Sequence, residues 1–528
     1  MFFIKCFRSK DNYSLRTRYV FKLFVNIFCL IINILIQAVV PRGLGPVAYG
    51  NFSFLTNFFN QIVTFFNMGT SHAFYTKLSQ RQSDYGLIVF YFYYAISVLL
   101  ATLSFIFLVN LFSLESLIWP DQYHVYIYYS AFYGFLLWAV QMLNNMIDAY
   151  GITVSAELFK AFQKVFAGMI ILLLFICKKL NLATFFYYQY LVLFIMALCF
   201  VYVMRKSNCL PHLDWFMTIK QIKSYIEEFY VYSHPLFIYG IAVVAAGILD
   251  RWLLQKYSGS VEQGFYGLAY QIASVCFFFA AAMTPLLIRE LSIAYGNNDM
   301  KLMSNLFRRY IPLLFSITAY FSCFIAFQAD KITMIMGGGK YKEALLAVII
   351  MSFYPIHQTY GQLSGSVFLA TGQTGLYRNI GITFVLIGLP ISYFLLASKH
   401  MGGIAAGSTG LALKMVLLQY FTVNAQLYFN TKLLNLSFWK YFLHQIVCIA
   451  SLLAVAGLFT SAVDYLLGAH MHGLCRLLIS GLFYTITVAV IVWYCPIIFG
   501  LRGNDIKILS DMLRQMIMNR ETMIKVQI

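Results

Sequence analysis

Long apolar runs separated by short polar segments make up most of the sequence. A helix that crosses a bilayer needs about 20 mostly apolar residues, and fourteen stretches reach about that length. They cover residues 19–40, 49–71, 86–110, 123–147, 159–177, 182–204, 230–250, 264–288, 309–328, 343–370, 379–397, 402–427, 441–463 and 474–499. This pattern predicts an all-α polytopic membrane protein with about 14 transmembrane helices.

The composition changes the picture by excluding other classes of protein. Hydrophobic residues make up 61% of the 528 residues and charged residues 11%, whereas soluble domains have about 45–50% and about 25%. A soluble domain could not cover so much apolar surface. Disordered chains, disulfide-rich secreted scaffolds and nucleic-acid-binding modules all need more charge or cysteine than this chain has, so these classes are excluded.

Basic residues are distributed unevenly over the predicted loops. The chain has 37 Lys and Arg against 19 Asp and Glu, a formal net charge of +18. If both termini are cytoplasmic, 26 basic residues fall on cytoplasmic segments, 10 fall on outer segments, and Lys414 lies within a span. The positive-inside rule therefore predicts this orientation. The first apolar stretch is long enough to span, so we expect no cleaved signal peptide.

Two segments 214 residues apart are similar to each other. The shift aligns Arg42 with Lys256, Gly45 with Gly259, Val47 with Val261, Gly50 with Gly264 and Phe52 with Tyr266. Each segment joins the first and second span of a six-span half, which is the parallel-repeat arrangement of alternating-access transporters. Chance similarity between two glycine-containing loops is the alternative.

The repeat predicts four regions along the chain. Residues 1–204 form an N-terminal lobe with spans one to six, and residues 230–427 form a C-terminal lobe with spans seven to twelve. Residues 205–229 form a cytoplasmic linker, and residues 428–528 contain spans thirteen and fourteen and a cytoplasmic tail. Apolar residues recur in the linker at spacings of four and three, and they are Trp215, Ile219, Ile222, Ile226 and Phe229. This spacing predicts an amphipathic helix in the membrane interface, with packing on the protein surface as the alternative.

Polar residues form stripes inside several spans. In span two, one helical face carries Asn57, Asn60, Thr64, Asn67 and Ser71. Further stripes lie in spans one, four and ten, and the last contains His357, Gln358, Gln362 and Ser366. Such stripes either join helices by hydrogen bonds or line a water-filled cavity. Four stripes favour a cavity, for which Asn57, Asn60, Asn67 and His357 are candidate lining residues.

A few basic residues lie within or at the ends of spans. Lys414 is twelve residues into span twelve, and an ionisable residue at that depth is a functional candidate by default. Snorkelling to the interface is the alternative. Arg42, Arg251, Arg289 and Arg378 lie at span ends, where loop anchoring or a local ion pair is the alternative. Basic residues around a polar cavity suit an anionic substrate such as a phosphate.

Coupling to a proton or sodium gradient would need an acidic residue that titrates or coordinates in the cavity. The candidates are Asp148, Glu157, Asp250 and Glu290, each near a span end. The sequence contains no P-loop, metal-ligand cluster or nucleophile elbow. We therefore expect a transporter without a cofactor or metal ion, and not an enzyme.

Residues Pro41 to Ser53 read PRGLGPVAYGNFS. This segment resembles the first outer loop of Wzx-type polysaccharide flippases, which belong to the multidrug/oligosaccharidyl-lipid/polysaccharide (MOP) exporter superfamily. Further resemblances follow in order along the whole chain, at Asp250 and Arg251, residues 264–268, Pro285, Leu286 and Arg289, and Gly337, Lys340, Tyr341 and Ala344.

The resemblance implies two pseudo-symmetric six-helix lobes around a central cavity, plus two C-terminal helices. It implies translocation of undecaprenyl-diphosphate-linked oligosaccharide across the bacterial inner membrane, for a surface polysaccharide such as O-antigen (lipopolysaccharide) or capsule. The basic cavity lining of such families is carried over to Arg42, Arg289 and Lys414, and also to Arg251 and Arg378. The implied partners are the lipid-linked oligosaccharide, a proton or sodium ion, membrane lipids and other polysaccharide assembly proteins, with no nucleic acid.

Two alternatives remain beside the flippase interpretation. A multidrug exporter of the same superfamily would favour acidic residues deep in the spans. A membrane polysaccharide polymerase or ligase would need a sizeable outer loop with catalytic Arg or His, whereas the outer loops here are short. Span one has no arginine, unlike the related lipid II flippases, which makes a peptidoglycan precursor a poorer substrate.

Overall fold

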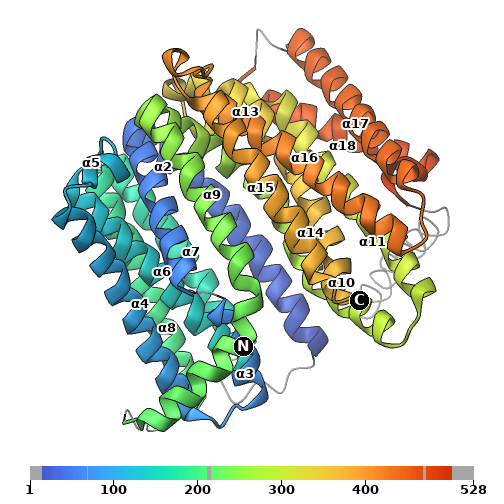
Figure 1. The fold of residues 1–528 in the computed structure, drawn as a ribbon. Coiled ribbons are helices and arrows are strands. Elements are labelled where there is room, and N and C mark those ends of the chain that lie inside the picture. Colours follow the sequence, from blue (N-terminus) through green and yellow to red (C-terminus); the bar gives the residue numbers. More distant parts are fainter. Residues whose placement is uncertain (1–14, 68, 208, 211–215, 468–470, 502–528) are drawn as a thin grey trace, which may run out of the picture. The chain divides into compact units, whose positions relative to one another are not determined.

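The computed structural model describes residues 15–67, 69–207, 209–210, 216–467 and 471–501, and its regular secondary structure within these residues is entirely helical (Figure 1). The first part of the chain contains α2 (Leu15–Asn67), α3 (Thr70–Gln80), α4 (Tyr85–Leu111), α5 (Glu115–Ile118), α6 (His124–Tyr150), α7 (Thr153–Ile176) and α8 (Leu182–Lys206). The remainder contains α9 (Ile219–Ser274), α10 (Phe278–Gly296), α11 (Met300–Phe327), α12 (Ala329–Met336), α13 (Leu345–Met351), α14 (Tyr354–Ala370), α15 (Thr374–Leu396), α16 (Gly407–Leu433), α17 (Phe438–Leu467) and α18 (Gly473–Tyr494).

The predicted apolar stretches all fall on helical segments. Helices α2 and α9 are long because each carries two predicted stretches, joined through a kink. Eight of the described helices are long and apolar enough to cross a membrane, and the others are shorter or more polar. The predicted fold class, an all-α polytopic membrane protein, is confirmed.

The chain forms two compact units, and the first contains most of the N-terminal part. Unit 1 comprises Met1–Leu268, Met336–Tyr341 and Val385–Leu411. In this unit α2 packs against α6 and α7, and α8 packs against α6 and α7 (Figure 1). Its largest core includes the stacked rings of Phe74 and Tyr91, whose centroids are 4.0 Å apart.

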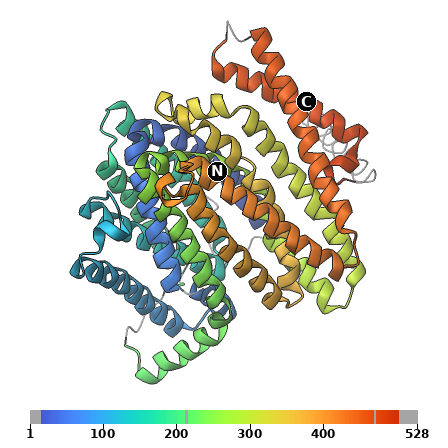
Figure 2. The same ribbon diagram turned by 45° about the horizontal axis from the view of Figure 1, so that its top comes forward.

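Unit 2 comprises Ala269–Ile335, Lys342–Phe384 and Ala412–Ile528. Helix α11 packs against α10, α14 and α17. Helix α18 lies beside α17, and these two are the orange-red helices of Figure 2. Phe315, Tyr360 and Tyr484 are fully buried in its core. The predicted tail from residue 502 onward lies outside the described residues, and the boundaries of the predicted lobes stay predictions.

Helices α2 and α9 share the same kink. Gly45 has φ 76° and ψ 169°, and Gly259 has φ 77° and ψ −174°. A residue with a side chain rarely adopts this region, so glycine is required at both positions. The two glycines are 214 residues apart, as the repeat in the sequence predicts. The backbone therefore supports the repeat at its best-matched segment.

The two kinked segments contact each other reciprocally. A Cβ atom added to Gly50 would lie 1.8 Å from the carbonyl oxygen of Ser260, and one added to Gly264 would lie 2.3 Å from that of Pro46. Ser260 follows Pro46 by the same 214 residues, so the contact has the symmetry of the repeat. Small residues allow membrane helices to approach this closely. We call residues 45–50 and 259–264 the glycine crossing.

Residues 205–207, 209–210 and 216–229 of the predicted linker are described, so Trp215 lies outside the described residues. Ile222 and Phe229 pack against the core of unit 1. Phe216 and Ile219 are instead 99% and 85% exposed. Phe216 precedes α9. The helix itself has one apolar stripe, in which Ile222 and Phe229 pack on the protein and Ile219 is exposed at the edge.

Candidate functional site

A buried arginine lies close to the glycine crossing in unit 1. Arg251 of α9 is only 9% exposed. Its Nη2 donates to Ser53 Oγ of α2 at 2.8 Å, and its Nη1 donates to Gln263 Oε1 at 2.7 Å. The guanidinium also lies over the ring of Tyr266, 4.5 Å from the centroid. Two hydrogen-bond acceptors and the face of an aromatic ring therefore stabilise the buried charge of Arg251.

Two acidic residues of α9 connect the same region to other helices of unit 1. Asp250 is buried, and its Oδ1 accepts a hydrogen bond of 2.6 Å from Ser392 Oγ of α15. Glu262 Oε2 accepts from the backbone N–H of Ser408 at 2.6 Å, in the first turn of α16. A carboxylate at a helix N-terminus is stabilised by the free N–H groups there. Both carboxylates thus fix the position of α9 within the unit.

A loop of unit 1, residues 337–341, packs against the crossing. Tyr341 is fully buried, with its ring centroid 6.5 Å from that of Tyr49 and 5.9 Å from that of Phe265. Its hydroxyl is shielded from solvent and has no hydrogen-bond partner within the described chain. Lys340 Nζ lies 3.8 Å from the position of a Cβ atom on Gly45. The side chain of Arg42 comes equally close to Gly338, so two cations lie beside the kink of α2.

The predicted polar stripe of α2 has two different structural roles. Asn57 is half-buried, and its Oδ1 is shielded from solvent without a partner in the described chain. Asn60 lies against Gly134 of α6. Asn67 Oδ1 accepts hydrogen bonds from Thr70 Oγ1 at 2.9 Å and from Ser71 Oγ at 2.9 Å. Asn67 therefore connects α2 to α3, whereas the side-chain oxygen of Asn57 can still accept a hydrogen bond from another group.

The predicted stripe of span ten, on α14, packs against α16 in unit 2. His357 is buried, with its ring centroid 5.1 Å from that of Tyr420. Ser364 Oγ donates to Gln426 Oε1 at 3.3 Å, and Asn430 Nδ2 donates to the carbonyl of Ser364 at 2.8 Å. These hydrogen bonds join the two helices, but Ser364 is not one of the predicted stripe residues, so the role of the stripe stays a prediction.

The basic candidates of unit 2 differ strongly in burial. Lys414 is only 5% exposed and lies in the second turn of α16. Burial of an ammonium group is costly unless nearby groups stabilise its charge. Arg289 is exposed and pairs with Glu290 at 2.6 Å. Arg378 donates to Asn379 Oδ1 at 3.2 Å near the start of α15. Lys414 alone of these three is withdrawn from solvent.

The acidic candidates also differ. Glu157 of α7 is 1% exposed, and its Oε1 accepts from Lys160 Nζ at 2.8 Å. Asp148 Oδ2 lies 3.5 Å from Asn144 Nδ2 in α6, at the long limit of a hydrogen bond. The sequence places Glu157 before the start of span five, so its near-complete burial is a finding of the structure. Glu157 and Asp250 are the buried acids of the set.

The predicted residues are divided between the two units. Unit 1 contains Arg42, Asn57, Asn60, Asn67, Asp148, Glu157, Asp250 and Arg251. Unit 2 contains Arg289, Glu290, His357, Arg378 and Lys414. The sequence does not reveal Ser53 and Gln263 as partners of Arg251, because single polar residues near a span end carry no signal of their partner. The binding and coupling roles of the set remain predictions.

A family model described as polysaccharide biosynthesis protein matches residues 19–288, which is half of the chain. No curated protein matches the chain in sequence.

Solved structures of several transporters share the fold. The lipid II flippase MurJ, in an inward closed conformation, matches with a TM-score of 0.64 at 12% identity, over 90% of this chain and 99% of that chain. An inward-facing multidrug resistance MATE family transporter of the MOP superfamily matches with a TM-score of 0.58 at 13% identity, over 80% and 96%. A MOP superfamily transporter from Pyrococcus furiosus matches with a TM-score of 0.52 at 13% identity, over 81% and 99%.

At these identities the structures show a common fold and nothing further about activity. The family match covers the glycine crossing, Arg251 and the kinks of α2 and α9. The chain thus has the fold of the MOP superfamily and belongs to the polysaccharide biosynthesis protein family.

Proposed function

We propose that the protein is a flippase that moves lipid-linked oligosaccharide across the bacterial inner membrane. The substrate is a polyprenyl diphosphate that carries a short oligosaccharide, and it passes from the cytoplasmic to the outer leaflet. Transport proceeds by alternating access, and the product supplies synthesis of a surface polysaccharide. The family match and the fold shared with a lipid II flippase both support this class of substrate.

The observation that carries the proposal is the burial of Lys414 inside an apolar helical bundle. Hydrocarbon cannot hydrogen-bond a diphosphate or a sugar, so a flippase must supply charge and polar groups along the route. An ammonium group withdrawn from water attracts a phosphate more strongly than an exposed one does, because the local dielectric constant is lower. Lys414 has the charge and burial that this task requires.

Arg42 and Lys340 support the same proposal in unit 1. Both lie beside the kink at Gly45, on a polar segment where Tyr341 keeps a buried hydroxyl without a partner in the described chain. Arg251 has a different role, because its guanidinium hydrogen-bonds Ser53 and Gln263. We propose Arg42 and Lys340 as diphosphate contacts and Arg251 as the residue that holds α2 to α9.

Glu157 is the acid that we propose for ion coupling. It is almost completely buried and forms an ion pair with Lys160. Protonation of the carboxylate would break this pair, so proton binding has a direct structural consequence.

A multidrug exporter is the competing function, because the MATE family transporter shares the fold. Cationic drugs are recognised by carboxylates, whereas the buried acids Glu157 and Asp250 already accept hydrogen bonds from Lys160 and Ser392. A polymerase or ligase is the enzymatic alternative.

Deletion of the gene in its own host distinguishes these functions. We expect lipid-linked oligosaccharide to accumulate on the cytoplasmic leaflet, where a membrane-impermeant glycosidase added to intact spheroplasts cannot reach it. Accumulation on the outer leaflet would overturn the proposal in favour of a polymerase or ligase. An unchanged pool with increased drug sensitivity would favour the exporter.

A further inference from the structure

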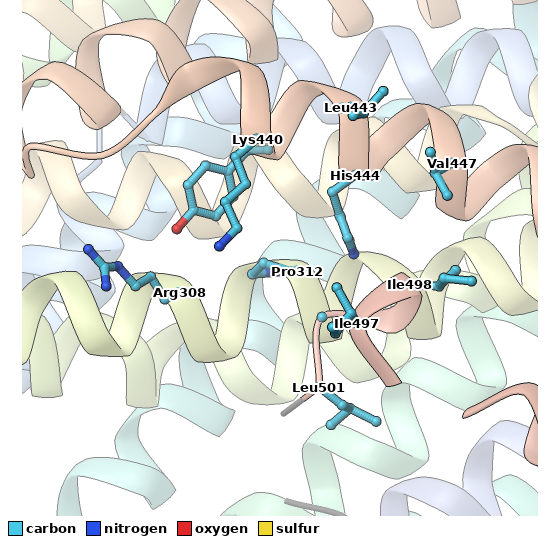
Figure 3. A pocket seen from close by; sticks show the side chains of 11 residues that line it. Arg308, Pro312, Lys440, Leu443, His444, Val447, Ile497, Ile498 and Leu501 are labelled. Atoms are coloured by element: carbon cyan, nitrogen blue, oxygen red, sulfur yellow. The ribbon is translucent and has the colours of Figure 1, made fainter. Parts of the chain in front are cut away.

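A cavity of about 460 Å³ lies within unit 2, and none of the candidate site residues lines it (Figure 3). It lies between α11, the first turns of α17 and the turn that follows α18. The eleven lining residues are Arg308, Pro312, Lys440, Tyr441, Leu443, His444, Val447, Ile497, Ile498, Gly500 and Leu501. We call this space the α11–α17 pocket.

The pocket is amphiphilic from one end to the other. Arg308 and Lys440 lie towards one end, and Val447 and Ile498 lie towards the other, with His444 between them (Figure 3). None of the eleven lining residues is acidic, so no lining carboxylate neutralises the two cations. Both cationic side chains are exposed to solvent. A ligand that matches the pocket needs an anionic group at one end and an apolar group at the other.

The far wall of the pocket is held in place by close packing. Gly500 has a φ of 70°, and a Cβ atom added to it would lie 2.4 Å from Cβ of Pro312. The turn after α18 therefore rests directly on α11, as only glycine allows. Phe499, next to it, is buried in the core of unit 2. The apolar wall is thus part of the packed structure and does not depend on a ligand to form.

We propose that the α11–α17 pocket binds an anionic phospholipid. The lipid phosphate lies between Arg308 and Lys440, and the first part of an acyl chain lies along Val447 and Ile498. A soluble anion would leave the apolar wall uncovered, and a zwitterionic lipid would leave the two cations without a net countercharge. In the predicted orientation both cations are cytoplasmic, and basic pockets between membrane helices on that side bind acidic head groups.

This inference is independent of the transported substrate. The pocket contains none of the residues proposed for translocation. A negative result for lipid binding therefore does not contradict the flippase function, and a negative result for transport does not contradict the lipid site. The test measures lipid binding and involves no transport.

Native mass spectrometry of the purified full chain tests the proposal, with phosphatidylglycerol and phosphatidylcholine of the same chain length as probes. We expect the wild-type chain to bind phosphatidylglycerol in preference to phosphatidylcholine. The double variant Arg308→Gln/Lys440→Gln should bind it about 30-fold more weakly, since each charge near the membrane contributes about fivefold. Arg309→Gln is the matched control, because Arg309 is the adjacent cation of α11 and does not line the pocket. It should bind as the wild-type chain does.

A second variant tests the apolar end without touching the charges. Val447→Trp fills that end, and we expect it to weaken phosphatidylglycerol binding as well, while gel filtration confirms that the chain is folded. Equal binding of the two lipids, or unchanged binding by the double variant, would overturn the proposal. Displacement of phosphatidylglycerol by inorganic phosphate at equal concentration would also overturn it, because a free anion would then suffice.

Discussion

Single glycines determine how closely two helices of unit 1 approach. Gly50 and Gly264 place the backbones of α2 and α9 in contact, because neither residue has a Cβ atom between them. The carbonyl groups they face belong to kinked helical segments and cannot rotate away as a flexible side chain would. The crossing therefore requires a residue without a Cβ atom at both positions.

Replacement of Gly264 by alanine should destabilise the protein. The added Cβ would lie 2.3 Å from the carbonyl oxygen of Pro46, and overpacking of this kind costs about 1–3 kcal/mol. Gly240→Ala in the same helix is the control, because a Cβ atom there meets nothing within 4 Å. Thermal unfolding in detergent measures both variants. Equal melting temperatures for the two would contradict the close contact.

Glu228 illustrates a charge whose effect depends on pH. Hydrogen bonds from Arg81 at 2.6 Å, and from Lys77 at 2.8 Å, hold the pKa of the Glu228 carboxyl below its ordinary value. A lowered pKa means that the folded state is stabilised above the pKa of the unfolded chain, about 4.3. This stabilisation is lost as the pH falls through the lower pKa of the folded state.

The variant Glu228→Gln should therefore melt earlier than wild type at pH 7, by the equivalent of about 1 kcal/mol or less, since the pair is partly exposed. The difference should shrink as the pH falls below about 4. Glu227→Gln is the control, because Glu227 is largely exposed and its carboxylate lies 3.9 Å from Lys223. A difference from wild type that persists undiminished at low pH would rule out the ion pair as its cause.

At the scale of the element, the linker helix at the start of α9 has one apolar stripe that is only partly covered by the protein. Ile222 and Phe229 are covered by unit 1, while Phe216 and Ile219 are exposed. Exposed apolar side chains beside lysines are typical of a helix at the membrane surface. The exposed edge of the stripe fits the predicted position in the membrane interface, which stays a prediction.

Spin labels at single cysteines test where the linker helix lies. A label at Ile219→Cys should collide more with oxygen, which partitions into lipid, than with a water-soluble nickel chelate. A label at Ser224→Cys, an exposed polar position of the same helix, should show the reverse. If both labels report water in proteoliposomes, the exposed face does not lie in the membrane interface.

The sequence predicts helices well and their partners poorly. Runs of apolar residues locate the helices because length and apolarity are local properties of the chain. The sequence repeat pairs Gly45 with Gly259 but places both in outer loops; the structure shows instead that each is a kink with positive φ inside a long helix. The hydrogen bond from Arg251 to Ser53 joins residues 198 positions apart, and no local pattern encodes it. Asn67 is similar, because its polar stripe does not reveal that it connects α2 to α3.

At the scale of the whole molecule, charge has two separate uses. Most of the net charge of +18 lies on predicted cytoplasmic loops and fits the positive-inside rule. A few charged residues are buried instead, among them Arg251, Glu157 and Lys414. Arg251 hydrogen-bonds Ser53 of α2 and Gln263 of α9, and Glu157 forms an ion pair with Lys160 one turn away in α7. Lys414 is the buried cation that we assign to the substrate.

Flipping of a fluorescent polyprenyl-diphosphate oligosaccharide in proteoliposomes tests this assignment most directly. Loss of a charge-assisted hydrogen bond costs about 1.5–3 kcal/mol, so Lys414→Ala should reduce the flipping rate about 10- to 100-fold. Lys414→Arg should retain part of the rate, and Lys432→Ala, an exposed lysine near the end of α16, should leave it unchanged. Normal flipping by a correctly inserted Lys414→Ala variant would contradict the account.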